Sequence, residues 1–529
     1  MPTTVRDAFF DVLRALEMTR IFSNPGSTEV PLLVDLPSDL EFVLALHEGS
    51  VVGMATGWAI GSGRPAMVLL HTTAGLGNAA GALATARVNR APLVVVVGQQ
   101  DRRHLASEPF LAGQLDGIAG NYPVWVGSPA RAADVPSAIA RAHHEARIGR
   151  GPALVIVPMN DWDEPAGDVD RLAAPQLLTM SHGVDEAACE RVAELLDKAT
   201  RPVIVSGAGA DDPDTWAALA ELAGRLDCVV WQEPFGAQAG FPQDSPHFAG
   251  HLPAGRAGVR SSLAGHDAVL VVGAPALRQY GYESGPLFEN GACVVVLSDD
   301  PSEAAHSTAD IAVVTTLPGF CATLSELVSV RTPRSVRNPP MLPTCPSVVD
   351  SLLAAHVFAA LAERLSPDTV VVEESPSTRM ELQQCVPARR PLGFLSAAMG
   401  GLGFALPAAA GLKMAQPDRP VVAVLGDGSS LYNIHALWSA QHYGVGVLYV
   451  VLSNGGYAIM DHLASVAGGK APWPGFADIS VAGLAAALGC ASARVTSHQE
   501  LLVRLDDLVP RLATMREPFL LDIAVDVLP

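Results

Sequence analysis

Two apolar runs in the last third of the chain each end in a short polar segment, and this arrangement strongly constrains the fold. Val421–Leu425 leads into Gly426-Asp427-Gly428-Ser429, and Val447–Leu452 leads into Ser453-Asn454-Gly455-Gly456-Tyr457. All-apolar runs of this length are typical of strands buried on both faces of a parallel sheet. Two such strands joined by a helix would bring Asp427 and Asn454, 27 residues apart, to the sheet edge where α/β proteins bind ligands.

The polar groups expected at this edge favour a hard metal ion. A carboxylate, an amide oxygen and a backbone carbonyl from the glycine-rich turn would form an incomplete all-oxygen octahedron. Mg²⁺ prefers such ligands and completes its shell with water and phosphate oxygens. The glycines would let a diphosphate approach the backbone closely. A plain surface turn has the same composition, and the strand before each polar segment is what favours the metal site.

Length and charge predict a multidomain protein without affinity for polyanions. A chain of 529 residues is too long to fold around a single hydrophobic core, so about three domains are expected. The net charge of −20 argues against nucleic acid or an anionic membrane as a partner. Neither a membrane-spanning apolar run nor a signal peptide is apparent. The seven cysteines are scattered without a C-x-x-C pair, so reduced thiols and a cytoplasmic location are expected.

Apolar strand-like runs alternate with helical segments along the whole chain. Besides the two runs above, they lie at residues 42–46, 66–70, 93–97, 153–157, 202–206, 268–272, 293–297 and 519–523. This alternation predicts an α/β protein with three doubly wound parallel-sheet domains. We expect the first domain over residues 1–165, the second over 183–330 and the third over 350–529. A polar stretch near 160–170 and a proline-rich stretch at 331–348 predict linkers between them.

The polar segments around Asp427 and Asn454 resemble the diphosphate-binding motif of thiamine diphosphate enzymes, although the first Asn of that motif is Ser453 here. The resemblance implies thiamine diphosphate and Mg²⁺ as cofactors, with Asp427, Asn454 and the Gly456 carbonyl as metal ligands. It adds further cofactor contacts from Gly428, Ser429 and Tyr457. It also implies a pyrimidine-binding, a middle and a diphosphate-binding domain. The cofactor would lie between the first domain of one subunit and the third of another, so the minimum is a homodimer, and a homotetramer is expected.

In that family a glutamate before a small-residue helix of the first domain contacts the aminopyrimidine ring and activates the cofactor. Glu48 opens such a segment at residues 48–60. A glutamate that merely stabilises a helix N-terminus is the structural alternative, and the metal motif favours the catalytic interpretation. The resemblance also implies that Leu402, next to Gly401, props the cofactor in a bent shape.

Several segments of the chain are similar to benzoylformate decarboxylase in particular. Asn24-Pro25-Gly26-Ser27 forms a turn after a strand, and His71 follows the apolar run Met67–Leu70. The similarity continues through Gly98-Gln99-Gln100 and His251–Gly255 to Gly400–Pro407. It implies that Ser27 holds a substrate carboxylate and that His71 relays protons. A turn serine and a hydrogen-bonded core histidine are the structural alternatives.

The chain departs from the benzoylformate decarboxylase pattern after Gly273-Ala274-Pro275. That family carries a second catalytic histidine there, whereas this chain has Tyr280, to which we assign a catalytic role. A phenol is a poorer proton shuttle than an imidazole at neutral pH, so slow protonation after CO₂ loss would favour attack on an aldehyde. Candidates to replace the missing histidine are His47, His104 and His462. The family's aromatic wall is replaced by Leu395-Ser396-Ala397, which is smaller and which we expect to be more polar.

These residues predict a lyase that decarboxylates a small-molecule 2-oxoacid, either benzoylformate or another with an aryl or bulky group. Met460 stands where pyruvate decarboxylases carry an acid, which disfavours pyruvate. A carboligase or acyloin lyase on the same scaffold, similar to benzaldehyde lyase or acetolactate synthase, is the alternative that Tyr280 favours. An acetolactate synthase-type enzyme with a structural flavin is less expected, because nothing in the middle domain marks a flavin site. Gly207-Ala208-Gly209 lacks the third glycine of a dinucleotide fingerprint and predicts a tight turn only. A non-catalytic cofactor-binding regulator would not need Glu48, Ser27 and His71 together.

Overall fold

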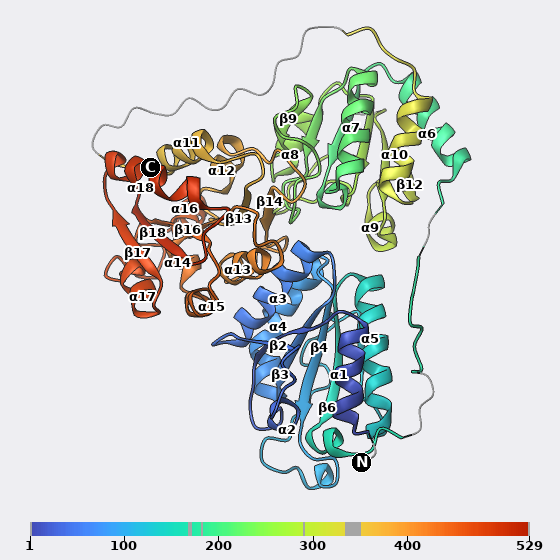
Figure 1. Ribbon diagram of the computed structural model, residues 1–529. Helices are drawn as coiled ribbons and strands as arrows, with labels where there is room; N and C mark the ends of the chain where they lie inside the picture. The colour runs from blue at the N-terminus through green and yellow to red at the C-terminus, as the bar shows by residue number, and fades with distance from the viewer. Residues whose placement is uncertain (1–2, 168–171, 181–182, 289–290, 334–350, 527–529) are drawn as a thin grey trace.

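The chain forms three α/β units, each built on a six-stranded parallel sheet, as a computed structural model shows (Figure 1). The structure describes residues 3–167, 172–180, 183–288, 291–333 and 351–526. The expected α/β class with three doubly wound sheets is therefore confirmed. The proline-rich stretch predicted as a linker falls almost entirely outside the described residues. Among the described helices, none is both long and apolar enough to cross a bilayer.

The first sheet carries the segments that contain Ser27, Glu48 and His71. Helices α3 (Glu48–Ser62) and α4 (Thr72–Val88) cover one face, and α1 (Val5–Ala15) and α5 (Val135–Gly149) cover the other. The central strands are buried along nearly their whole length, as their all-apolar sequences predict. In spatial order the strands are β2 (Glu41–Leu44), β1 (Arg20–Asn24), β3 (Ala66–His71), β4 (Leu93–Gln99), β6 (Pro152–Pro158) and β5 (Trp125–Gly127).

The third sheet repeats the strand order of the first. Its strands are, in spatial order, β14 (Phe394–Ser396), β13 (Val370–Glu374), β15 (Val421–Gly426), β16 (Leu448–Ser453), β18 (Phe519–Ala524) and β17 (Ala491–Val495). The first and third units thus share one design, as the resemblance implies. Strands β15 and β16 are adjacent and parallel, with Gly426 opposite Leu452. The polar segments that follow them therefore begin at the same edge of the sheet.

The middle sheet has the doubly wound order 3-2-1-4-5-6 when it is followed from β9 to β12. Its strands, in that order, are β9 (Phe248–His251), β8 (Val230–Gln232), β7 (Pro202–Ser206), β10 (Ala268–Val272), β11 (Cys293–Ser298) and β12 (Ile311–Val314). Helices α6 (Glu186–Lys198), α7 (Pro213–Leu226) and α10 (Leu317–Leu327) pack together on one face. The strand order reverses between β7 and β10.

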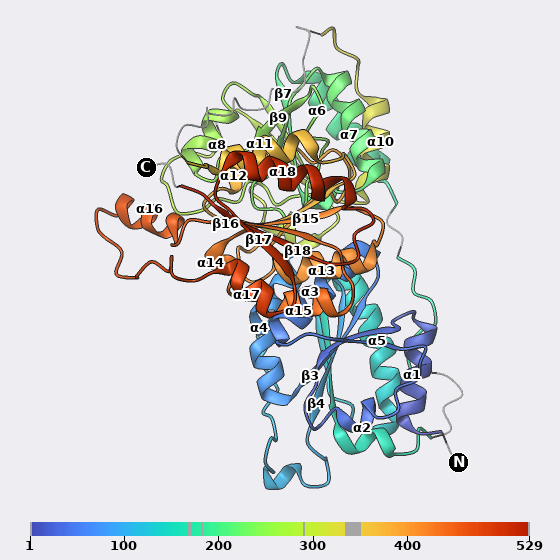
Figure 2. The same cartoon turned by 60° about the vertical axis from the view of Figure 1, so that its left-hand side comes forward.

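Helix α3 also packs against α13 (Ala405–Ala415), and this contact joins the first and third units into one hydrophobic core (Figures 1 and 2). Small residues make the approach possible. A Cβ added at Gly57 would overlap the carbonyl oxygen of Ala408, and one at Gly411 would overlap that of Met54. The residues of α3 from Gly49 to Ala59 are all buried, which confirms the tightly packed helix predicted for this segment.

The polar stretch near 160–170 is not simply a linker, because its first half belongs to the first unit. The ring of Trp162 packs edge-on against Phe9, with 5.1 Å between the ring centroids. Asp161 is fully buried and accepts a hydrogen bond of 2.9 Å from Arg102 Nε. A polar sequence suggested exposure, but Arg102 supplies the partner that allows the carboxylate to be buried.

Candidate active site

Asp427 and Asn454 lie at the carboxyl ends of adjacent strands. Asp427 Oδ1 accepts the N–H of Gly428 at 2.7 Å, and Oδ2 accepts the N–H of Gly455 at 2.7 Å. Because Gly455 follows Asn454, the second bond ties the two polar turns together. Burial raises the pKa of Asp427. No cationic side chain among the described residues forms an ion pair with this carboxylate, so its charge is available to a bound cation.

The neighbouring groups fit a hard divalent ion and a phosphorylated ligand. The Asn454 side-chain oxygen accepts the N–H of Gly456 at 3.0 Å, which fixes its direction in the turn. Carboxylate, amide and carbonyl oxygens are the donor set that Mg²⁺ prefers. Gly455 has a φ of +74°, which favours glycine, and a Cβ at Gly428 would lie 2.6 Å from the Tyr457 ring. These two glycines therefore keep the turns compact.

Residues of both turns, including Asp427 and Asn454, line a cavity of about 890 Å³. Its volume is in the range of cofactor and substrate sites. The residues of the predicted site that line it are Gly401, Leu402, Asp427, Gly428, Ser429, Asn454, Gly456, Tyr457 and, from the middle unit, Tyr280. The structure thus brings together every predicted site residue of the second and third units.

Glu374, which sequence reasoning missed, holds the turn that carries Leu402. Its carboxylate accepts the N–H groups of Gly403, Phe404 and Ala405 at 2.5, 2.7 and 2.6 Å. Burial raises the pKa of Glu374 to about 8, although the three N–H donors act in the opposite direction. A signal was present in the sequence, because Glu374 ends a buried apolar strand just as Asp427 follows one.

Apolar side chains also line the cavity. Ile459, Met460 and Leu463 of α16 (Ala458–Val466) line it together with Pro376 and Ala397. Helix α16 buries none of its residues and projects beyond the third sheet (Figure 2). Ser396, predicted to make this wall more polar, is instead buried and accepts a hydrogen bond of 2.8 Å from Arg379 Nη2.

His71 ends β3 and lies against the turn that follows β1. Its Nδ1 is 3.0 Å from Glu29 Oε2 and 3.0 Å from Thr28 Oγ1. Glu29, which sequence reasoning also missed, is only 1% exposed. The turn places Ser27 beside this group with its side chain exposed. The sequence signal was slight, because Glu29 stands two residues beyond the Asn24–Ser27 turn and its partner is 42 residues away.

Glu48 is the first residue of α3 and is half-buried. One of its carboxylate oxygens accepts a hydrogen bond of 3.0 Å from Asn78 Nδ2 of α4. Neither Glu48, Ser27 nor His71 lines the cavity that contains Asp427. Within one chain, the predicted residues of the first unit therefore form a group separate from those of the second and third units.

Tyr280 lies on a loop that is anchored to the middle unit. Its N–H donates to the Ala254 carbonyl at 2.9 Å, and its side chain is 66% exposed at the mouth of the cavity. None of the three histidines considered as replacements lines the cavity. His47 instead accepts the N–H of Gly49 at 3.0 Å, and His104 and His462 are exposed.

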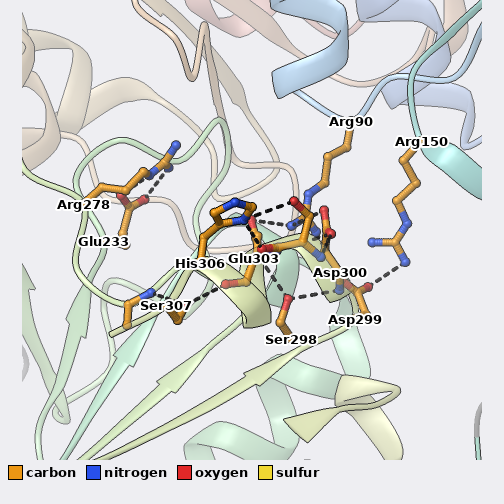
Figure 3. Close-up of polar contacts among 12 residues, drawn as sticks. Arg90, Arg150, Glu233, Arg278, Ser298, Asp299, Asp300, Glu303, His306 and Ser307 are labelled. Atoms are coloured by element: carbon orange, nitrogen blue, oxygen red, sulfur yellow. Dashed lines mark hydrogen bonds and ion pairs between the residues drawn. The ribbon is translucent and has the colours of Figure 1, made fainter. Parts of the chain in front are cut away.

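A second, smaller cavity of about 220 Å³ lies where the middle sheet reverses its strand order. Arg90 of the first unit reaches its edge and contacts Asp299 at 3.1 Å and Glu303 at 2.5 Å (Figure 3). Arg150 makes a further contact of 2.6 Å with Asp299. A Cβ at Gly209 would lie 3.0 Å from Gly273 Cα, so this turn packs on the protein itself, as expected for a tight turn.

Each of three family models matches part of one of the three α/β units. The thiamine pyrophosphate enzyme N-terminal TPP binding domain matches residues 3–119. The central domain of these enzymes matches 189–327, and their C-terminal TPP binding domain matches 376–523.

Individual proteins are similar to this chain over most of its length. Benzoylformate decarboxylase of Pseudomonas aeruginosa is 39% identical over 472 residues, covering 88% of each chain. An acetolactate synthase large subunit of Parasynechococcus marenigrum is 28% identical over 477 residues, covering 84% of this chain and 75% of its own. Among solved structures, a thiamine diphosphate-dependent 4-hydroxybenzoylformate decarboxylase of Rhodococcus jostii has a TM-score of 0.92 at 33% identity, covering 99% of each chain.

Proposed function

The chain belongs to the thiamine pyrophosphate enzymes, and we propose that it is a Mg²⁺-dependent decarboxylase of benzoylformate or a closely related aryl 2-oxoacid. The observation that carries this proposal is the cavity that Asp427, Asn454 and Leu402 line together with apolar side chains of α16. The 39% identity to benzoylformate decarboxylase along most of the chain supports the same substrate class.

Residues of the third unit would hold the cofactor. Asp427, Asn454 and the carbonyl of Gly456 would ligate Mg²⁺, which would in turn bind the diphosphate. The Leu402 side chain would support the bent cofactor, with Glu374 keeping its turn in place. When bound, thiamine diphosphate supplies the electron sink that makes loss of CO₂ possible.

Residues of the first unit would handle protons and orient the substrate. Glu48 would contact the aminopyrimidine ring, Ser27 would hold the substrate carboxylate, and His71 would transfer protons. Because these three residues do not line the cavity of their own chain, we propose that a second subunit supplies them. The assembly would be at least a homodimer, and a homotetramer is expected from the family resemblance.

The cavity wall supports a large apolar substituent on the 2-oxoacid. Ile459, Met460 and Leu463 offer aliphatic and thioether surface suited to an aromatic ring. Met460 and Leu463 are 43% and 37% exposed in the chain, so apolar surface remains for a substrate to cover. A short substrate such as pyruvate would leave much of this wall in contact with water.

Carboligation is the second candidate activity, and Tyr280 is the observation that favours it. The phenol lines the cavity, whereas none of the three candidate histidines does so. Slow protonation after CO₂ loss would leave time for an aldehyde to react. A flavin-dependent acetolactate synthase activity is not favoured, because the cavity of the middle sheet holds only about 220 Å³ and Arg90 pairs with acids at its edge.

A panel of 2-oxoacids tests the proposed activity. We expect CO₂ release that requires both thiamine diphosphate and Mg²⁺, with kcat/KM highest for benzoylformate or 4-hydroxybenzoylformate and lowest for pyruvate. Glu48→Gln should abolish turnover, and unchanged activity in that variant would argue for an unconventional role. Absence of turnover on every member of the panel would refute decarboxylation.

Added aldehyde separates the two candidate activities. If Tyr280 slows protonation, wild-type protein should convert part of the 2-oxoacid and added benzaldehyde into a 2-hydroxyketone. Tyr280→His should shift the products towards free aldehyde. Release of aldehyde alone by the wild-type protein, at the same ratio as in the variant, would remove carboligation as a candidate.

A further inference from the structure

We propose that Glu29 is a positioning residue for the reaction, holding His71 in the one tautomer and orientation that allow its Nε2 to exchange a proton. The proposal rests on the proton-transfer role given to His71 under the proposed function. Glu29 would not touch the substrate or the cofactor, and it would act only through the imidazole.

The hydrogen bonds around Glu29 leave its carboxylate with a single arrangement. Oε2 accepts the N–H of Gly26 at 2.8 Å and lies 3.0 Å from His71 Nδ1. Oε1 accepts the Thr28 hydroxyl at 2.5 Å. A carboxylate can only accept hydrogen bonds, so its contact with His71 Nδ1 requires the proton of the neutral imidazole to reside on Nδ1. The Nε2 atom then carries the lone pair.

Two glycines leave room for this arrangement. A Cβ added at Gly98 would overlap the Glu29 carboxylate, and one added at Gly26 would overlap the His71 ring. Gly98 pairs with His71 across strands β3 and β4, so the carboxylate lies over the sheet edge at the level of the imidazole. The backbone of three separate segments therefore encloses the pair.

The hydrogen bond between Glu29 and His71 is strengthened because both side chains are largely shielded from water. The Glu29 side chain is 1% exposed and that of His71 is 15% exposed. A buried carboxylate would be unfavourable without donors, and here the backbone, a hydroxyl and the imidazole supply them. Among the described residues, Glu29 is the one acid in ion-pair distance of the ring, and Thr28 is its one hydroxyl partner.

The proton would move without changing the charge of Glu29. During product formation Nε2 would take up a proton from the solvent buffer and release it to the carbon that has lost CO₂, which returns the imidazole to its neutral form. The imidazolium formed in between would be stabilised by the adjacent carboxylate, which keeps its own oxygens unprotonated. The same division of tasks between a carboxylate and an imidazole orients histidines in other catalytic sites.

Glu29→Gln tests the proposal in the full-length holoenzyme. The glutamine is the same size but has no charge, so kcat should fall about 100-fold while KM for the 2-oxoacid stays within about threefold. Glu29→Asp should recover part of the activity. Glu41→Gln, an exposed acid of the same sheet, is the matched control and should behave like the wild type.

A double-mutant cycle separates positioning from a merely structural role. In a His71→Ala background, adding Glu29→Gln should change kcat by less than about threefold, because the group that Glu29 orients is already absent. If the two losses instead multiply, Glu29 acts independently of His71 and the proposal fails. It fails likewise if Glu29→Gln decarboxylates as fast as the wild type.

A spectroscopic measurement keeps this test independent of the proposed function. Solid-state ¹⁵N NMR of histidine-labelled protein, with His71→Ala for assignment, should show the neutral imidazole protonated on Nδ1. In Glu29→Gln the two tautomers should become mixed. If the wild type turns over no 2-oxoacid, the proposed function is lost but these spectra still decide the contact, and an Nε2-protonated His71 would overturn it.

Discussion

Glu374 ends strand β13, Asp427 follows the neighbouring strand β15, and both side chains are buried. The two carboxylates differ in the groups to which they are hydrogen-bonded. Glu374 accepts three N–H groups from the start of α13, so its carboxylate is committed to the Leu402 turn. Asp427 accepts N–H groups from both polar turns, including those of Gly428 and Gly455, and has no cationic partner among the described residues. At the scale of single residues, this difference separates a group that shapes the site from one that would bind an ion.

Replacing Asp427 should abolish cofactor binding without unfolding the chain. Asp427→Asn keeps the size of the side chain but removes its charge, so affinity for thiamine diphosphate with Mg²⁺ should fall about 100-fold or more. Because burial raises the pKa of Asp427, wild-type affinity should also weaken as the pH falls and the carboxylate protonates. Calorimetric titration measures both effects. Asp418→Asn, at an exposed position, should bind like the wild type, and equal binding by Asp427→Asn would contradict the metal-ligand role.

Glu374 should make stability depend on pH. Its pKa of about 8 in the folded chain lies above the ordinary value of 4.5, so its contribution to the free energy of unfolding is complete below about pH 4.5 and is lost as the pH rises through about 8. Glu374→Gln removes this titration. In urea unfolding of the cofactor-free protein, the free energy of unfolding of the variant should rise relative to that of the wild type as the pH increases from about 5 to about 8.

The exposed Glu363→Gln provides the matched control for that experiment. It should show the same pH dependence as the wild type, because its side chain is 72% exposed. If the difference between Glu374→Gln and the wild type is constant with pH, the three N–H donors outweigh burial and Glu374 is ionised throughout.

At the scale of elements, the contact between α3 and α13 connects the predicted catalytic glutamate to the cofactor unit. Helix α3 begins with Glu48, and α13 begins just after the Leu402 turn. The small residues of both helices let the two backbones touch, so the orientation of one helix restricts the other. A helix that is apolar on all sides is expected to be buried, and α3 is buried in this way.

A methyl group in this contact should destabilise the protein. Gly57→Ala would force Cβ against the Ala408 carbonyl oxygen, and the free energy of unfolding should fall by about 1–3 kcal/mol. Gly224→Ala in α7 is the control, because its Cβ would lie 3.9 Å from the nearest atom, and it should be neutral or stabilising by up to about 1 kcal/mol. Denaturant unfolding compares the two, and equal stability of both variants would show that the helices can separate at little cost.

At the scale of the whole molecule, the predicted site is divided between two places on one chain. The cavity with Asp427 and Leu402 is lined by the second and third units, whereas Glu48, Ser27 and His71 belong to the first. If the site residues are assigned correctly, a complete site would require the first unit of another copy. Since a twofold axis would create two equivalent sites, each would combine residues from both subunits.

Mixing two inactive variants should restore activity. In a hybrid of one Glu48→Gln and one Asp427→Asn subunit, one site carries both substitutions and the other carries neither. A hybrid dimer isolated through two different affinity tags should therefore show about half the wild-type activity, although each parent variant is inactive. An inactive hybrid would show that each chain forms its own site.

Much of the fold follows from short stretches of sequence. The apolar runs predicted as β3, β4, β6, β7, β10, β11, β15, β16 and β18 are strands, because a run that is apolar on both faces is stable only inside a sheet. The short edge strands, such as β5, β12 and β14, went unrecognised. Strand β12 alternates between half-buried and exposed residues, so its composition differs little from that of a loop.

The residues of the cofactor cavity could be named from their motifs because each motif lies within a few positions of a strand end. Glu374 also ends a strand, but its role, like that of Glu29, depends on partners that only packing brings near, about 30 and 42 residues away. Chain order likewise could not reveal that Glu48 would be absent from the cavity of its own chain. Local sequence determines which strands and turns form, since neighbours in the chain decide their conformation. The tertiary structure alone decides which buried carboxylate meets which donor, since that depends on contacts between segments far apart in the chain.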